Sequence, residues 1–157
     1  MGRVVVGVDG SEGSRRALAW AVDEAMLRGA SLEVIYTYEH HLAWWGYGAT
    51  EDMSASAMQQ MHEEIESAAR AAALHAQELV DGMVEGLSGP DVKSTAIESS
   101  RPAETLVDHS KDADLLVVGS RGRGGFKSLM LGSVSQQCAQ HAQCPVVIIR
   151  SEPDAQD

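Results

Sequence analysis

One stretch near the carboxyl terminus decides the fold, and it reads Ala113-Asp-Leu-Leu-Val-Val-Gly-Ser-Arg-Gly-Arg-Gly-Gly-Phe-Lys-Ser-Leu-Met-Leu-Gly-Ser-Val-Ser-Gln-Gln137. The apolar run from Leu115 to Val118 is unbroken, which is typical of a parallel strand that is buried on both faces. Gly119 ends that strand abruptly, and the residues from Val134 to His141 have a helical pattern. The stretch therefore predicts a strand, a glycine-rich connection and a helix.

The connection has the chemistry of a phosphate-binding loop. Its glycines at 119, 122, 124 and 125 carry no side chain, so main-chain N–H groups can approach an anion closely. Its cations are Arg121, Arg123 and Lys127. Gly132 and Ser133 then open the predicted helix, whose first turn offers unpaired N–H groups and a positive dipole end. The alternative is a glycine-rich connection that binds nothing, but such a cationic loop is uncommon as a mere spacer.

The better-known phosphate loops have different spacings. A Walker A loop needs a glycine directly before its lysine, whereas Lys127 follows Phe126. The dinucleotide fingerprint is also missing, and this loop follows a late strand instead of the first one. The spacing that is present is Gly119, two residues, Gly122, nine residues and Gly132-Ser133. In this spacing and its flanking elements the chain resembles the ATP-binding branch of the universal stress protein family.

Length and charge narrow the range of functions. The 157 residues suit one domain, which we expect over 1–150, with 151–157 as a frayed tail. The formal net charge is -11 and aromatic residues make up 4%, which argues against broad contact with nucleic acid or an anionic membrane. From Leu115 to Ser151 there is no Asp or Glu, so an anionic ligand would be drawn to that part of the chain.

The termini and cysteines give weaker indications. The chain passes from Met1 straight into a strand without an apolar leader or a bilayer-length run, so we expect a cytoplasmic protein. Cys138 and Cys144 are not spaced as a CxxC pair, which favours reduced structural thiols.

Adjacent histidines at 40 and 41 point opposite ways in an extended loop, and we expect no metal site there. The loop from His40 to Tyr47 could cover a ligand or fold back on the core.

Along the chain, strands and helices alternate. Strands are predicted at 3–9, 31–38, 92–99, 115–118 and 145–150, and helices begin near Ser11, Thr50, Pro102 and Val134. The alternation predicts a parallel sheet covered by helices on both faces, with 92–99 at an edge because its residues alternate in polarity. The helix from Thr50 to about Val80 has one apolar stripe, which predicts core packing: Met58, Met61, Ile65, Ala68, Ala69, Ala72, Ala76 and Leu79.

The resemblance implies more than the pattern does. It implies a doubly wound five-stranded parallel α/β sheet of order 3-2-1-4-5, similar to the adenine nucleotide alpha hydrolases, and it covers nearly the whole chain. Ligands then bind beyond the first and fourth strands, which end at Asp9 and Gly119. One departure is Ser99-Ser100-Arg101, where family members usually have a glycine before the proline.

The resemblance also assigns a nucleotide to this crevice. Gly7 and Asp9 would line the adenosine side, and Thr37 would meet the base through its backbone. On its own, Asp9 before Gly10 is equally explained as a turn or capping residue. Ser135 would add a hydroxyl to the site. Ribose and phosphates would contact two sets of residues: Gly119, Ser120, Arg121, Gly122, Arg123, Gly124 and Gly125, and then Gly132, Ser133 and Val134.

The predicted function is that of an ATP-binding stress-response module, with AMP or cAMP as alternative ligands and slow ATP hydrolysis as a further alternative. We find no placed base, nucleophile or metal clamp, so a dedicated enzyme is not predicted, although Mg²⁺ could accompany ATP. A phospho-acceptor receiver would need an acidic cluster where Asp9 stands alone, and a pyrophosphate-releasing synthetase would need a Ser-Gly-Gly-x-Asp-Ser loop. We also expect a homodimer through the apolar edge strand Pro145 to Arg150.

Overall fold

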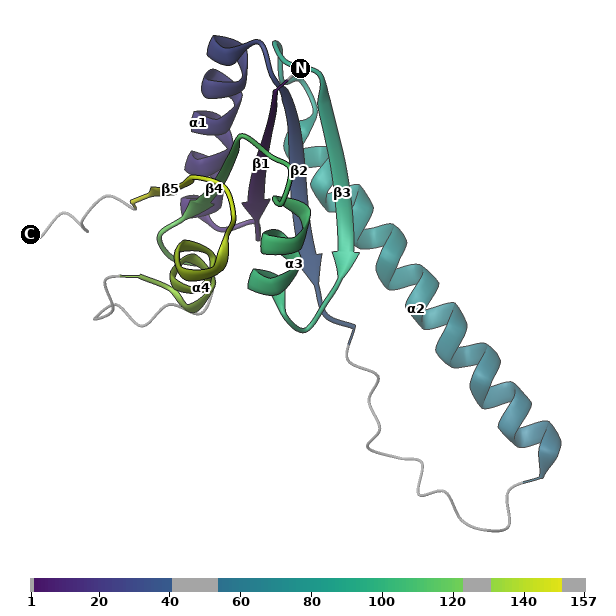
Figure 1. The fold of residues 1–157 in the computed structure, drawn as a ribbon. Coiled ribbons are helices and arrows are strands. Elements are labelled where there is room, and N and C mark those ends of the chain that lie inside the picture. The colour runs from purple at the N-terminus through teal and green to yellow at the C-terminus, as the bar shows by residue number, and fades with distance from the viewer. Residues whose placement is uncertain (1, 41–53, 123–130, 151–157) are drawn as a thin grey trace, which may run out of the picture.

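Five parallel strands form the centre of the protein. The computed structural model describes residues 2–40, 54–122 and 131–150 (Figure 1). The sheet order is β3-β2-β1-β4-β5, as predicted, and every neighbouring pair is parallel. The strands are β1 (Arg3–Val8), β2 (Ser31–Tyr38), β3 (Val92–Glu98), β4 (Leu115–Gly119) and β5 (Val146–Ile149). The predicted strand at 92–99 is an edge strand, and β5 forms the other edge.

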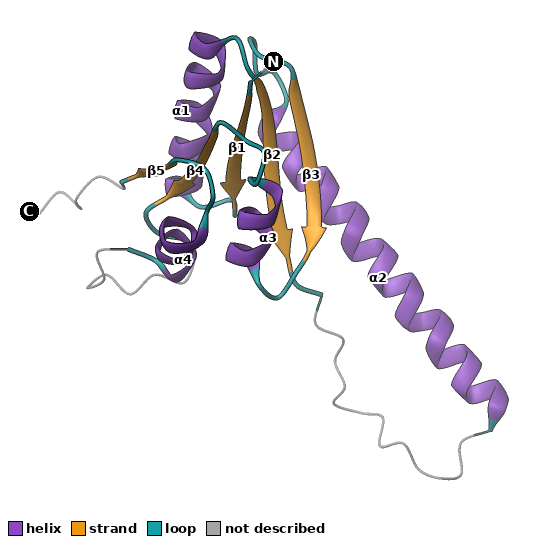
Figure 2. Cartoon of the chain, in the orientation of Figure 1, coloured by secondary structure: helices purple, strands orange, loops and turns teal. Residues whose placement is uncertain are grey.

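Four helices cover the sheet on its two faces (Figure 2). They are α1 (Glu12–Arg28), α2 (Ala55–Val84), α3 (Pro102–His109) and α4 (Ser133–His141). One apolar cluster joins Val4, Val6 and Val8 of β1 to α1 and α2, while a second joins Val5 to α3 and α4. Successive residues of a strand point to opposite faces, so a strand with helices on both sides must be apolar throughout. This explains the continuous apolar runs of β1 and β4.

Local signals in the sequence set the ends of α1. The Ser11 hydroxyl accepts a hydrogen bond from the Ser14 N–H at 3.2 Å, as an N-cap does. At the other end Gly29 adopts φ 61°, and its N–H bonds to carbonyls of the last turn. The start at Ser11 was predicted, and both boundaries depend on local chemistry, because serine caps and left-handed glycines act within one turn of the helix.

The apolar stripe of α2 packs on the core over only part of its length. Ala76 and Val80 are its buried residues, whereas Met58 is 56% and Leu79 is 40% exposed. The prediction that the whole stripe fills the core is therefore wrong. A helix of 30 residues is about 45 Å long, but the seven residues of β3 span only about 23 Å. The amino-terminal half of α2 accordingly lies away from the sheet (Figure 1).

Candidate functional site

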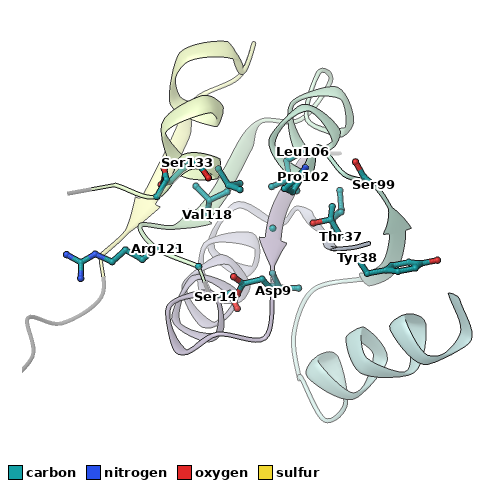
Figure 3. A pocket seen from close by; sticks show the side chains of 18 of the residues that line it. Asp9, Ser14, Thr37, Tyr38, Ser99, Pro102, Leu106, Val118, Arg121 and Ser133 are labelled. Atoms are coloured by element: carbon teal, nitrogen blue, oxygen red, sulfur yellow. Dashed lines mark hydrogen bonds between the residues drawn. The ribbon is translucent and has the colours of Figure 1, made fainter. Parts of the chain in front are cut away.

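A cavity of about 600 Å³ opens at the carboxyl ends of β1 and β4. The sheet winding reverses between these two strands, since the chain leaves β1 for α1 on one face and β4 for α4 on the other. The volume lies in the usual range of small-molecule pockets. Ten predicted site residues line it, some of them labelled in Figure 3: Gly7, Asp9, Thr37, Gly119, Arg121, Gly122, Gly132, Ser133, Val134 and Ser135.

Asp9 and Gly122 bring the connection between β1 and α1 into contact with the connection between β4 and α4. The Asp9 Oδ1 atom accepts a hydrogen bond from the Ser11 N–H at 2.9 Å, which is the turn role considered above. Its Oδ2 atom lies so close to Gly122 that a Cβ built there would be 2.6 Å away. Asp9 therefore stabilises its own turn and also lines the cavity beside the glycine connection.

Two further glycines of the site are explained by close packing. A Cβ on Gly7 would lie 2.6 Å from Cδ1 of Leu106, so the bare backbone of β1 lets α3 approach. A Cβ on Gly119 would lie 3.0 Å from the carbonyl carbon and oxygen of Gly13 in the first turn of α1. Neither glycine has a positive φ. The glycines at these strand ends thus allow α1, α3 and the loop after β4 to meet around one cavity.

Ser120 occupies a different position from its predicted neighbours. It is buried and is absent from the cavity lining. Its N–H donates to the Ile149 carbonyl of β5 at 2.7 Å, and its carbonyl accepts from the Gly132 N–H at 2.7 Å. Its main chain thus joins the loop to β5 and α4. Arg123, Gly124 and Gly125 lie outside the described residues.

The first turns of α1 and α4 differ in how their N–H groups are used. In α1, Ser11 caps the helix and Glu12 adds a carboxylate. In α4, the N-cap is Gly132, no side chain caps the helix, and its first turn has no acidic residue. The first N–H groups of a helix lack intrahelical partners and carry partial positive charge. The beginning of α4 is therefore the end that suits an anion, and Ser133 and Val134 place it on the cavity wall.

Charges in the cavity lining are separated. Arg121 lies beside the start of α4. Asp9 directly follows β1, and Glu39 directly follows β2. An anionic group is favoured at the α4 side, and hydrogen-bond donors such as hydroxyls or amines are favoured at the carboxylate side. In residues 2–40, 54–122 and 131–150, no cluster of three or more His, Cys, Asp or Glu could hold a metal ion.

Several lining residues of the cavity were not predicted from the sequence. Tyr38 is the last residue of β2, Glu39 follows it, and Ser99 follows β3. All three could have been found from the rule that carboxyl ends of parallel strands share one edge of the sheet. Leu106 and Pro102 enter the wall from α3. Their position depends on how α3 packs beside Gly7, which no local pattern reports.

The two thiols lie in the α4–β5 region, away from the cavity lining. Cys138 is fully buried and Cys144 is half-buried, and neither is in a disulfide. Burial raises the pKa of the Cys138 thiol to about 11, with a smaller contribution from Cys144. This environment agrees with the prediction of reduced structural thiols, because a neutral thiol is a poor nucleophile.

Comparison with known proteins decides the family. Residues 1–150 match the Universal stress protein family. The chain belongs to this family. It is 38% identical over 153 residues to a universal stress protein of Mycolicibacterium smegmatis, covering 94% of this chain and 45% of that protein. It is 33% identical to one from Thermus aquaticus, covering 94% of this chain and 97% of the other. The chain thus spans about half the length of the mycobacterial relatives that it matches.

Solved universal stress proteins share the fold. A universal stress protein in complex with cAMP matches with a TM-score of 0.63 at 23% identity, covering 96% of this chain and 98% of that one. A family protein from Arabidopsis thaliana with AMP bound matches with a TM-score of 0.58 at 19% identity, covering 100% of this chain and 96% of that one. At such identities the likeness shows the α/β fold. In the described part of this chain, no helix is long and apolar enough to cross a membrane.

Proposed function

We propose that this universal stress protein binds an adenine nucleotide, with ATP as the ligand, and acts as a nucleotide-dependent stress-response module. The observation that carries the proposal is the uncapped, acid-free start of α4 on the wall of a 600 Å³ cavity, beside the glycine connection that ends β4. Family membership supports it, because solved family members are complexes with cAMP, dAMP or AMP.

The charges of the cavity suggest how the nucleotide lies. Phosphates would contact the N–H groups of Ser133 and Val134, the glycine backbone from Gly119 and the Arg121 guanidinium. Asp9 would accept hydrogen bonds from the ribose hydroxyls, and the base would lie towards Thr37, between the ends of β2 and β3. A Mg²⁺ ion accompanying ATP would be held mainly by phosphate and water, because Asp9 and Glu39 are the carboxylates of the described wall.

A second candidate function is binding of AMP or cAMP. It is favoured by the single guanidinium among the described lining residues, which suits one phosphate better than three. Slow ATP hydrolysis is a further alternative, and we expect it to be weak at most, since no hydrogen bond among residues 2–40, 54–122 and 131–150 joins Ser133 to a base.

Titration calorimetry with ATP, AMP, cAMP and adenosine tests the proposal. The expected order places ATP first and adenosine last, because phosphates add contacts at α4. Tighter binding of AMP or cAMP would select the second candidate. No heat and no displacement with any of the four would remove the proposed function. Mass spectrometry of small molecules released from freshly purified protein supplies an independent readout.

We also propose a two-fold dimer through β5. This edge strand is Val-Val-Ile-Ile, its residues are half-buried, and within the described part of the chain β4 is its one neighbour in the sheet. Unpaired N–H and C=O groups on such an edge can pair with a second strand. Sedimentation should give a dimer at micromolar concentration, and a monomer there would refute this arrangement. Cytoplasmic location stays a prediction.

A further inference from the structure

Ser135 is a buried serine of the cavity wall whose hydroxyl meets main-chain carbonyls. It is 2% exposed, although it is only the third residue of α4. Its hydroxyl donates towards two carbonyls, that of Ser120 at 3.0 Å and that of Gly132 at 2.9 Å. Ser120 directly follows β4 and Gly132 is the N-cap of α4, so this one side chain joins the two ends of the connection between them.

The Ser120 carbonyl is the common acceptor at this point. It receives the Gly132 N–H at 2.7 Å and the Ser135 hydroxyl at 3.0 Å, which uses both of its lone pairs. On its amide side, Ser120 donates to Ile149 of β5 at 2.7 Å. A Cβ on Gly132 would come within 3.4 Å of the same Ser120 oxygen. The two ends of the connection are therefore held together by main-chain hydrogen bonds and by one buried hydroxyl.

We propose that Ser135 is a positioning residue for the phosphate end of the site, acting through Ser120 and Gly132 instead of through a contact with ligand. The inference rests on the proposed nucleotide function. The phosphate site needs Gly119, Gly122 and the N–H groups of Ser133 and Val134 to lie together on the cavity wall. The hydrogen bonds to the Ser120 carbonyl fix that relation before ligand arrives, and such preorganisation lowers the cost of binding.

This role has a measurable consequence for affinity. If the hydroxyl is removed, Ser120 and Gly132 are held together in a smaller fraction of the molecules, and the apparent dissociation constant rises by the inverse of that fraction. Loss of one neutral hydrogen bond lowers the ratio of closed to open molecules about fivefold, and this is the upper limit of the change in affinity. We expect Ser135→Ala to bind ATP measurably more weakly, by up to about fivefold. Adenosine should bind as it does to the wild type, since it has no phosphate to place at α4.

Ser110→Ala is a matched control. Ser110 is also fully buried, and its hydroxyl donates to the Val107 carbonyl at 3.0 Å. It follows the carboxyl end of α3 and is absent from the cavity lining. Both variants therefore lose one buried hydroxyl that is bonded to a main-chain carbonyl. They should lower the thermal midpoint by similar amounts, while only Ser135→Ala weakens ATP binding.

The experiment combines calorimetry with amide hydrogen exchange of the ligand-free protein. In Ser135→Ala, the Gly132 amide should exchange about fivefold faster than in the wild type, since its partnership with the Ser120 carbonyl is loosened. Weaker ATP binding with unchanged exchange would overturn the proposal in favour of direct ligand contact. Equal losses for ATP and adenosine, or no loss for either, would also overturn it. A wild type that binds no nucleotide would instead refute the proposed function itself.

Discussion

Replacing Gly122 by valine tests the site most directly. A Cβ at this position would lie 2.6 Å from Asp9 Oδ2, so the carboxylate must retreat by about 0.8 Å to reach the 3.4 Å of ordinary contact. That retreat disturbs the 2.9 Å hydrogen bond from the Ser11 N–H. Loss of one charged hydrogen bond to ligand costs about 1.5–3 kcal/mol, or roughly 10- to 150-fold in affinity. The methyl groups of valine also enter the cavity, so we expect ATP binding to be abolished.

The fold should survive this change. Gly122 is absent from the positive-φ glycines, so its backbone conformation suits a residue with a side chain. We expect the free energy of unfolding to fall by at most about 1.5–3 kcal/mol, the value of the Asp9–Ser11 hydrogen bond, which leaves the protein folded. Gly82→Ala in α2 is the control, because a Cβ there meets nothing within 4 Å. This variant should raise the free energy of unfolding by about 0.5–1 kcal/mol and leave the ATP affinity unchanged.

Calorimetry with ATP and urea denaturation of the same samples provide the two readouts. ATP binding by Gly122→Val within threefold of the wild type would refute the placement of ligand beside the glycine connection. If the valine variant fails to fold, Gly122→Ala gives the answer, because among the described residues its single methyl group meets the Asp9 carboxylate.

Three further perturbations follow from the same geometry. Gly119→Ala should lower stability by about 1–3 kcal/mol, since its Cβ would lie 3.0 Å from backbone atoms of Gly13; an unchanged thermal midpoint would contradict this packing. Asp9→Asn keeps an oxygen for the Ser11 N–H but removes the charge, so nucleotide affinity measured by calorimetry should fall about tenfold; tighter binding would mean that Asp9 faces a phosphate. Burial raises the pKa of Cys138 in the folded protein to about 11, above the ordinary thiol value of 9.0, so its contribution of about 2–3 kcal/mol to the free energy of unfolding is present below pH 9 and is lost as the pH rises towards 11. Urea denaturation across that range should show a smaller loss for Cys138→Ala than for the wild type, and equal losses would contradict the raised pKa.

Much of the fold could be predicted from the sequence because its signals are local. Continuous apolar runs mark β1 and β4, Ser11 and Gly29 bound α1, and Pro102 opens α3. The spacing of Gly119, Gly122 and Gly132 indicated a phosphate loop and the family, and the family match over residues 1–150 confirms the second of these. Each signal lies within a few residues of the feature that it specifies.

Other features depend on residues that are distant in the chain. The stripe of α2 reports an amphipathic helix, but the length of sheet available to cover it is set by β2 and β3, so Met58 is exposed where core packing was predicted. Gly7 and Gly119 are small because α3 and α1 approach them, not because of their own backbone angles.

The sequence by itself determined the order of strands and helices, the cationic glycine connection and the absence of acidic residues from Leu115 to Ser151. Only the tertiary structure decided that Asp9 faces Gly122. It also decided that Ser120, predicted as a ligand contact, instead accepts a hydrogen bond from the buried Ser135 hydroxyl. The physical reason is range: turn chemistry and periodicity act over a few residues, whereas these contacts join segments that come together only when the sheet forms.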